Sequence, residues 1–333
     1  KRLEDAAKDE SVRGVLLSIQ SPQLGRARVL ELRESIQHIR DQGKPVVAHL
    51  ISGEPLDYSV AAACDRIVIP PAATLAITGV RTEVTFYKGL LDRLGIQAEI
   101  LQVGEFKGAG EPLTRVSMSP QLRQQYESFV GDLFEQMVEQ ISEDRSLEKE
   151  KVRELIDIGI FTPDQAVQAS LVDGIAYEDE VLSGFSASSA DSLQDFRRDY
   201  GKQDVDTDFS GLSGFMKLVD ILSGTEKISQ KNASKRIAII HVQGEIVDGR
   251  GSVGMFGGSA AGSEAITKAI RQASEDASVA ALVIRINSPG GSALASDLIW
   301  RELDRCHKPI VASLSDTAAS GGYYIAVAAD EIV

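Results

Sequence analysis

The sequence lacks the features that mark a membrane span, a thiol-ligated metal site or a nucleic-acid-binding surface. No run approaches the roughly 18 consecutive apolar residues of a membrane helix. The two cysteines, Cys64 and Cys306, form no metal-type spacing, and buried structural roles are expected for both. The net charge is −14, with 49 acidic against 35 basic residues, which argues against a broad phosphate-binding surface. We therefore expect no nucleic-acid partner. The opening residues, "KRLEDAAKDE", show no signal-peptide pattern.

What the sequence does contain is an internal repeat. "SVRGVLLSIQSP" (11–22) lines up with "SVAALVIRINSP" (278–289), "KPVVAHL" (44–50) with "KPIVASL" (308–314), and "YSVAAACDRIV" (58–68) with "YYIAVAADEIV" (323–333). The three blocks recur in the same order, which a duplicated domain explains better than chance does.

Each copy has the pattern of a βαβ unit. An apolar strand, 14–19 or 281–286, ends in a Ser-Pro turn. A stretch with apolar residues at three- and four-residue spacing follows the turn and predicts a helix. Lys-Pro then introduces a second apolar strand, and an alanine-rich segment leads to a third. This alternation predicts an α/β fold with parallel sheets covered by helices.

The repeat also predicts the domain organisation. We expect an N-terminal repeat over 1–182, a linker rich in Ser, Gly and Asp over 183–234, and a C-terminal repeat over 235–333. The second copy opens with a predicted strand, 236–247, whereas the first enters inside the matching helix. We therefore expect the first repeat to lack its first strand and the second to be truncated at its C-terminus, as in a fragment of a longer protein. Within the linker, 214–224 is amphipathic and fits either a packed helix or a membrane-surface segment.

A candidate nucleophile lies where the two copies differ. The second copy has "NSPGGSA" and "TAASGGYY" where the first has "QSPQLGR" and "SGEPLDYS". Ser320 stands among alanines and glycines, as a serine does in a nucleophile elbow, and Pro55 stands opposite it in the first copy. Gly290, Gly291 and Gly321 are candidates for an oxyanion hole, because backbone amides at such turns stabilise developing negative charge. The alternative is that these glycines only permit tight turns.

A serine nucleophile needs a base, and no histidine lies in a catalytic motif. Structural roles are expected for the four histidines, His38, His49, His241 and His307. A lysine is then the alternative base, provided that its surroundings keep it neutral. Lys107 is the candidate because it follows an apolar stretch, 98–106, which we interpret as a strand, and glycines surround it. Most other lysines lie in charged, solvated runs.

Three motifs together carry a family resemblance. "RINSPGG", "AASGGYY" and "VGEFKGAGEPLTR…MSP" resemble the signal peptide peptidase A (protease IV) family in its long tandem-repeat form, within the Clp protease/crotonase superfamily. The resemblance covers nearly the whole chain apart from the linker. It implies tandem duplicated domains of the ββα-superhelix type, with Ser320 as the nucleophile and Lys107 as the general base.

The resemblance has further implications and two departures. It implies a homotetramer, anchored to the bacterial inner membrane by a helix that is not in this chain, with its catalytic part on the periplasmic side. Phe106 replaces the tyrosine that is usual in the family, and Gly108 replaces the serine that usually follows the lysine. The phenylalanine keeps the bulk without the hydroxyl, and the glycine removes a polar neighbour of the base.

The leading hypothesis is a serine endopeptidase that degrades cleaved signal peptides and other short apolar peptides, with no metal or cofactor. One alternative is a non-catalytic, membrane-associated scaffold of the same fold. The other is a crotonase-like acyl-CoA enzyme, which would need an adenine-nucleotide pocket, and the sequence has no basic cluster suited to one.

Overall fold

The computed structural model describes residues 2–21, 24–51, 53–187, 196–197, 200, 235–249, 251 and 260–333. The chain forms two compact units, Lys1–Leu24 with Val29–Gly201, and Gly25–Arg28 with Lys202–Val333. The predicted linker lies largely outside the described residues, and its amphipathic stretch lies wholly outside them.

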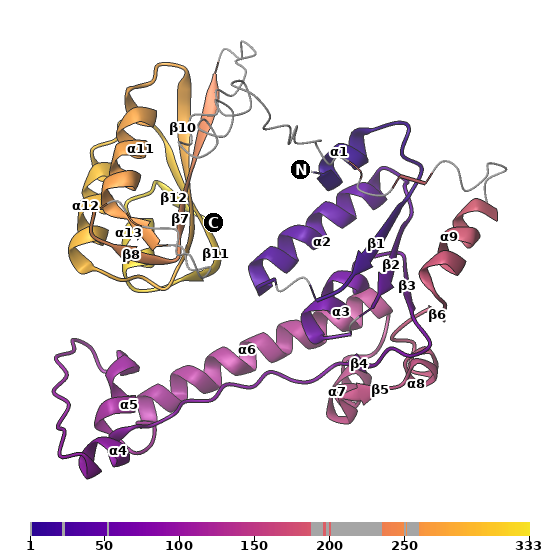
Figure 1. Ribbon diagram of the computed structural model, residues 1–333, viewed down its shortest axis with the longest axis horizontal. Coiled ribbons are helices and arrows are strands. Elements are labelled where there is room, and N and C mark those ends of the chain that lie inside the picture. The colour runs from indigo at the N-terminus through magenta and orange to yellow at the C-terminus, as the bar shows by residue number, and fades with distance from the viewer. Residues whose placement is uncertain are drawn as a thin grey trace, which may run out of the picture. The chain divides into compact units, whose positions relative to one another are not determined.

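The first unit is built on a parallel four-stranded sheet (Figure 1). In spatial order its strands are β1 (Val15–Ile19), β2 (Val46–Leu50), β3 (Arg66–Ile69) and β6 (Gly174–Ile175). A short antiparallel pair joins β4 (Leu75–Ala76) to β5 (Ile160–Phe161). The helices around these strands are α1 (Arg2–Lys8), α2 (Arg26–Asp41), α3 (Pro55–Ala62), α6 (Pro120–Arg145), α7 (Lys149–Ile158), α8 (Pro163–Gln168) and α9 (Glu178–Ala187). All five residues of β2 are buried, as expected for an apolar parallel strand.

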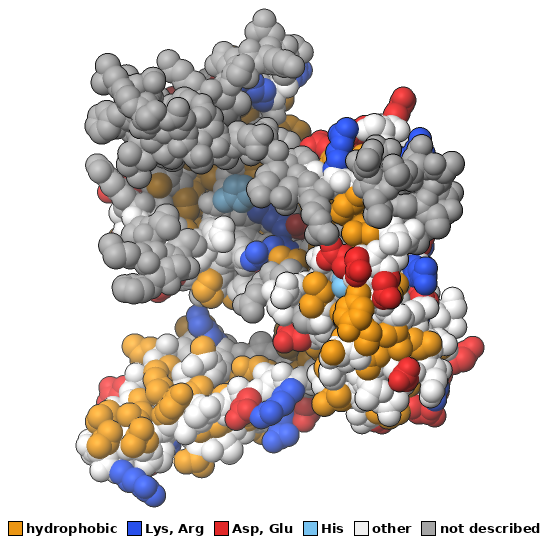
Figure 2. Space-filling view, turned by 45° about the vertical axis from the view of Figure 1, so that its right-hand side comes forward, with side chains coloured by type: hydrophobic (Ala, Val, Ile, Leu, Met, Phe, Trp, Pro, Cys, Tyr) orange, Lys and Arg blue, Asp and Glu red, His pale blue; other side chains and the backbone are white. Residues whose placement is uncertain are grey.

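An arm, residues 80–133, extends from this unit (Figure 1). It contains α4 (Lys88–Arg93), the 3₁₀ turn η1 (Gly108–Gly110), α5 (Glu111–Thr114) and the first half of α6. Hydrophobic side chains gather on its surface (Figure 2), among them Leu101 and Val103, which are fully or almost fully exposed. The stretch 98–106 was predicted as a strand, and this is wrong: it pairs with no strand within the described residues. Its apolar pattern lacks the hydrogen-bonding neighbour that a strand requires.

The second unit repeats the parallel sheet. In spatial order its strands are β12 (Glu331–Ile332), β11 (Ile310–Ala318), β10 (Val279–Ser288) and β7 (Arg236–Gln243). A small parallel pair, β8 (Glu245–Val247) and β9 (Ala260–Gly262), lies beside it. The helices are α11 (Ser263–Glu275), α12 (Ala293–Asp304) and α13 (Gly321–Ala326). The strand predicted over 236–247 is two strands, because Gly244 has a φ of +82° and turns the chain between them. The predicted α/β class with parallel sheets is confirmed.

Two side chains that recur in the repeated sequence make the same contacts in both units. Nζ of Lys44 donates to carbonyl oxygens at the end of α1 at 2.8–2.9 Å, and Nζ of Lys308 does the same at the end of α11 at 2.6–2.7 Å. Such contacts satisfy carbonyls that a helix leaves unpaired at its end. Asp65 and Asp330 each accept the first amide of the preceding strand at 2.8 Å. The repeated residues are thus explained by helix capping and strand alignment.

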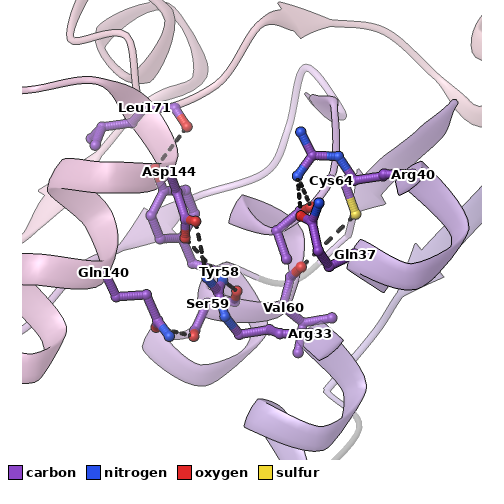
Figure 3. Close-up of polar contacts among 11 residues, drawn as sticks. Arg33, Gln37, Arg40, Tyr58, Ser59, Val60, Cys64, Gln140, Asp144 and Leu171 are labelled. Carbon is purple, nitrogen blue, oxygen red and sulfur yellow. Dashed lines mark hydrogen bonds and ion pairs between the residues drawn. The ribbon is translucent and has the colours of Figure 1, made fainter. Parts of the chain in front are cut away.

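Polar contacts hold α3 in the core of the first unit (Figure 3). Tyr58 is almost fully buried, and its hydroxyl donates to the Leu171 carbonyl at 2.8 Å. Arg33 forms a 2.9 Å ion pair with Asp144 and donates to the carbonyl of Ser59. The turn of the first copy that corresponds to the Ser320 turn is therefore followed by a helix tied down by structural contacts.

Of the two cysteines that were predicted to be buried, Cys64 is buried and Cys306 is only partly so. Cys64 is buried beside α3, and burial raises the pKa of its thiol to about 12. Cys306 is half-buried and packs against the core of the second unit.

Replacing Tyr58 by phenylalanine tests the anchoring of α3. The change removes a buried hydroxyl and leaves the Leu171 carbonyl without its donor. We expect a loss of about 1–3 kcal/mol in the free energy of unfolding, measured by urea denaturation. Tyr177→Phe is the control, because that ring is about half exposed. Equal stability of the two variants would contradict the assigned role.

Candidate active site

Ser320 occupies a strained turn between β11 and α13. Its φ of +50° and ψ of −118° form a combination that residues other than glycine rarely adopt. The residue is exposed. Ser146 also has a positive φ, but it ends α6 in the ordinary left-handed conformation, with a ψ of +44°. A strained serine at a sharp strand-to-helix turn is the geometry of a nucleophile elbow.

A bulge in β11 places this turn. Ile286 of β10 lies opposite Leu314 of β11, and Ser288 of β10 lies opposite Ala318 of β11. Between these two pairs β10 advances by two residues, whereas β11 advances by four. β11 therefore has two extra residues here, which redirect its end. The Ser288 carbonyl then accepts the amide of Ala319 at 3.0 Å and holds the turn against the end of β10.

The Pro-Gly-Gly turn after β10 lies directly against Ser320. Gly290 has a φ of +96°, and a Cβ there would lie 2.8 Å from the Cβ of Ser320 and 2.6 Å from the amide nitrogen of Gly321. Only glycine fits such a position. Gly290 thus does more than permit a tight turn, because it lets the two turns touch.

The amides of the three candidate glycines differ in what they bind. The Gly290 amide donates to the hydroxyl of the fully buried Ser288 at 3.1 Å. Within the described part of the chain, the Gly291 and Gly321 amides have no hydrogen-bond partner. These two amides are therefore the better candidates for binding an oxyanion, and Gly290 is the residue that brings their turns together.

The direction of the Gly291 amide is set by β8. Ile246 forms a parallel bridge with Gly291, in which its N–H donates to Gly290 and its carbonyl accepts from Ser292, both at 2.8 Å. In a parallel bridge these bonds flank the middle residue, whose own amide points away from the paired strand. The Gly291 amide is thus directed away from β8.

The helices beside the turn expose apolar side chains. α12 and α13 pack together and expose Leu294, Leu298, Tyr323, Tyr324 and Val327. The hydroxyl of Tyr324 donates to Asp297 at 2.8 Å, and this bond raises the pKa of the tyrosine. An apolar surface of this kind suits an apolar substrate better than a charged one.

Lys107 lies in the arm of the first unit, immediately before η1, and its side chain is exposed. The next residue, Gly108, is buried, and a Cβ there would lie 2.6 Å from Cδ1 of Leu122. The glycine that replaces the expected serine is therefore matched to a leucine that fills the space. Because Ser320 belongs to the second unit, its pairing with Lys107 stays a prediction.

A buried carboxylate holds the loop that follows Lys107. Glu111 accepts the Ser119 amide at 2.8 Å and the Ser119 hydroxyl, and that hydroxyl caps α6 by accepting the amide of Leu122. Burial raises the pKa of Glu111, but the bonds from Ser119 and the charge of Arg115 outweigh it, so the pKa lies below its ordinary value. Sequence reasoning missed this link, although "GEP" and "MSP" mark both of its ends.

Neither His49 nor a cluster of acidic side chains adds a candidate within the described residues. His49 is buried in β2, with Nε2 3.3 Å from the Ala176 carbonyl oxygen, and has a structural role. In the described residues, no group of three His, Cys, Asp or Glu side chains is placed to hold a metal ion. None of the helices that are described is long and apolar enough to cross a membrane.

Replacing Glu111 by glutamine tests the loop anchor through its pH dependence. A carboxyl whose pKa is lower in the folded state stabilises the fold above its unfolded pKa of about 4.3, and this stabilisation is lost as the pH falls through the folded pKa. The difference in unfolding free energy between wild type and Glu111→Gln should therefore be largest near neutral pH and shrink below about pH 4.

Urea denaturation across this pH range measures the difference. Glu127→Gln on the exposed side of α6 is the control. A gap for Glu111→Gln that does not change with pH would contradict the anchor.

Two family models match the chain. Residues 38–190 match "Peptidase family S49", and residues 215–333 match "ClpP-like SDH-type serine proteinase". The chain is 31% identical over 330 residues to "Serine protease SPPA, chloroplastic" of Arabidopsis thaliana, covering 98% of this chain and 46% of the relative. It is 28% identical to "Protease 4" of Haemophilus influenzae and 29% identical to "Protease 4" of Salmonella typhi, covering 99% of this chain and 52% of each relative. The chain thus spans about half the length of these relatives.

Proposed function

Since the chain belongs with the S49 serine peptidases of the signal peptide peptidase A type, we propose that it carries the catalytic residues of a serine endopeptidase. Ser320 is the nucleophile, Lys107 is the general base, and the amides of Gly291 and Gly321 form the oxyanion hole. One observation supports the proposal above the others. An exposed serine in a strained elbow lies against a glycine turn, and two glycine amides at these turns lack partners within the described residues.

In the proposed reaction, Oγ of Ser320 attacks the carbonyl carbon of the peptide bond, and the neutral amine of Lys107 takes the hydroxyl proton. The carbonyl oxygen becomes an oxyanion and accepts hydrogen bonds from Gly291 and Gly321. Each such donor stabilises the transition state by roughly 3–4 kcal/mol. Collapse breaks the C–N bond, and the leaving amine takes the proton from Lys107. The same lysine then takes a proton from a water molecule, which attacks the ester carbonyl, and as the C–O bond breaks the lysine returns that proton to Oγ of Ser320.

The proposed substrates are cleaved signal peptides and other short apolar peptides. Exposed apolar side chains on α12 and α13 support this choice, because they offer contacts to apolar residues next to the scissile bond. We further propose a homotetramer that associates with a membrane, with the catalytic part on the periplasmic side. The apolar surface of the arm offers a contact area for such an assembly.

Separate Ser320→Ala and Lys107→Ala substitutions in the full-length protein test the catalytic pair. Each should lower kcat/KM for an apolar fluorogenic peptide by about 10³-fold or more, because nucleophile and base act as a unit. Exposed residues supply matched controls, Ser128→Ala on α6 and Lys268→Ala on α11, and both should retain wild-type activity. Wild-type activity in either catalytic variant would contradict the pair.

A fluorophosphonate probe separates the peptidase from the scaffold alternative. The probe should label wild type and Ser128→Ala but not Ser320→Ala, since it reacts with an activated serine. Wild-type protein that resists labelling would favour a non-catalytic scaffold over the proposed function.

A further inference from the structure

A buried hydroxyl on α12 touches both turns of the site. Ser296 is 2% exposed, and its Oγ donates to the carbonyl of Ser292 at 2.8 Å. Ser292 directly follows Gly291, and its own hydroxyl caps α12 by accepting the amide of Ala295 at 3.1 Å. Ser296 thus anchors the residue next to one of the two unpartnered amides.

The same hydroxyl lies against the residue that carries the other amide. A Cβ on Gly321 would lie 2.2 Å from Oγ and 3.2 Å from Cβ of Ser296. Gly321 is not in the left-handed region, so its backbone does not require glycine. It is Ser296 that leaves no room for a side chain at this position.

A helical serine that bonds the carbonyl four residues earlier is common and by itself indicates nothing. Thr267 on α11 makes the same contact with Ser263 at 2.8 Å, far in the sequence from either turn. Ser296 differs because it lies between the two turns. In the first copy the matching helix position is Val29 when the Ser-Pro turns are aligned, and Leu32 when the Lys-Pro pairs are aligned. The hydroxyl therefore occurs only in the repeat that carries Ser320.

We propose that Ser296 is a positioning residue that fixes the spacing between the Gly291 and Gly321 amides. Its hydroxyl binds the carbonyl of Ser292, the residue after Gly291, and its side chain fills the space beside Gly321. The inference rests on the proposed function, because it concerns the oxyanion hole of that reaction. Oxyanion contacts are made in the transition state, so a change in their spacing lowers kcat while KM stays nearly unchanged.

The first test is Ser296→Ala in the full-length protein, with an apolar fluorogenic peptide as substrate. We expect kcat to fall about tenfold with little change in KM, because misplaced groups lose part of their transition-state stabilisation. Thr267→Val is the matched control, since it removes the same kind of helical hydroxyl away from the site. Urea denaturation of both variants checks that stability changes equally.

The second test is a double-mutant cycle with Gly321→Ala. The new methyl group would collide with the Ser296 hydroxyl and displace the Gly321 amide, so kcat should fall about 100-fold. The Ser296→Ala, Gly321→Ala double variant lacks Oγ of Ser296, the atom closest to the new methyl group. Its kcat should therefore be higher than that of Gly321→Ala alone. Independent, merely structural effects would instead multiply.

The outcomes distinguish the positioning role of Ser296 from the proposed peptidase function. If Ser296→Ala stays within about twofold of Thr267→Val in kcat, or if the losses in the cycle multiply, the positioning role is wrong. If fluorophosphonate labels wild type normally in that case, the proposed peptidase function still stands. If wild type is not labelled at all, both the function and the role of Ser296 are overturned.

Discussion

The candidate site in the second unit depends on the close approach of two backbone turns at the ends of β10 and β11. Gly290 lies so near Ser320 that a single Cβ would separate the turns. Three features hold the turns in this position. They are the bulge in β11, the hydrogen bond from the Ala319 amide to the Ser288 carbonyl, and the pairing of β8 with Gly291. The result is an exposed hydroxyl beside two amides without partners in the described chain. A parallel sheet favours such a site, because its strand ends lie at one edge.

The first unit shows what the same framework does without that contact. There the residue aligned with Ser320 is Pro55, which is the first residue of α3, and this helix is held by Tyr58 and Arg33. The lysines that cap helix ends and the aspartates that bind the first amide of a strand make the same contacts in both units. The shared sequence therefore stabilises the fold. The glycines that differ between the copies lie at the two turns of the candidate site. This division is expected when a duplicated domain keeps its scaffold and specialises one of its turns.

Much of this was readable from the sequence, because apolar periodicity and Gly or Pro punctuation are local signals. The strands and helices of the repeated blocks and the turn at Ser320 were predicted on that basis. The strand predicted over 98–106 failed, because its pattern says nothing about whether a neighbouring strand is present to pair with it. For a related reason the sequence did not show that the Gly290 amide already has a hydrogen-bond partner. Which of the two adjacent amides, Gly290 or Gly291, lacks a partner depends on a hydrogen bond to Ser288, and the two glycines look alike in sequence. Ser296 gave no signal because it lies inside a helical pattern.

The central claim is that Ser320 reacts while the amides of Gly291 and Gly321 hold the developing charge. The most direct measurement is a crystal structure of the full-length protein after reaction with a fluorophosphonate. The account predicts a covalent bond from Oγ of Ser320 to phosphorus, with the phosphonyl oxygen about 3 Å from both amide nitrogens. A phosphonyl oxygen bound by the Gly290 amide, or an adduct on another residue, would contradict it.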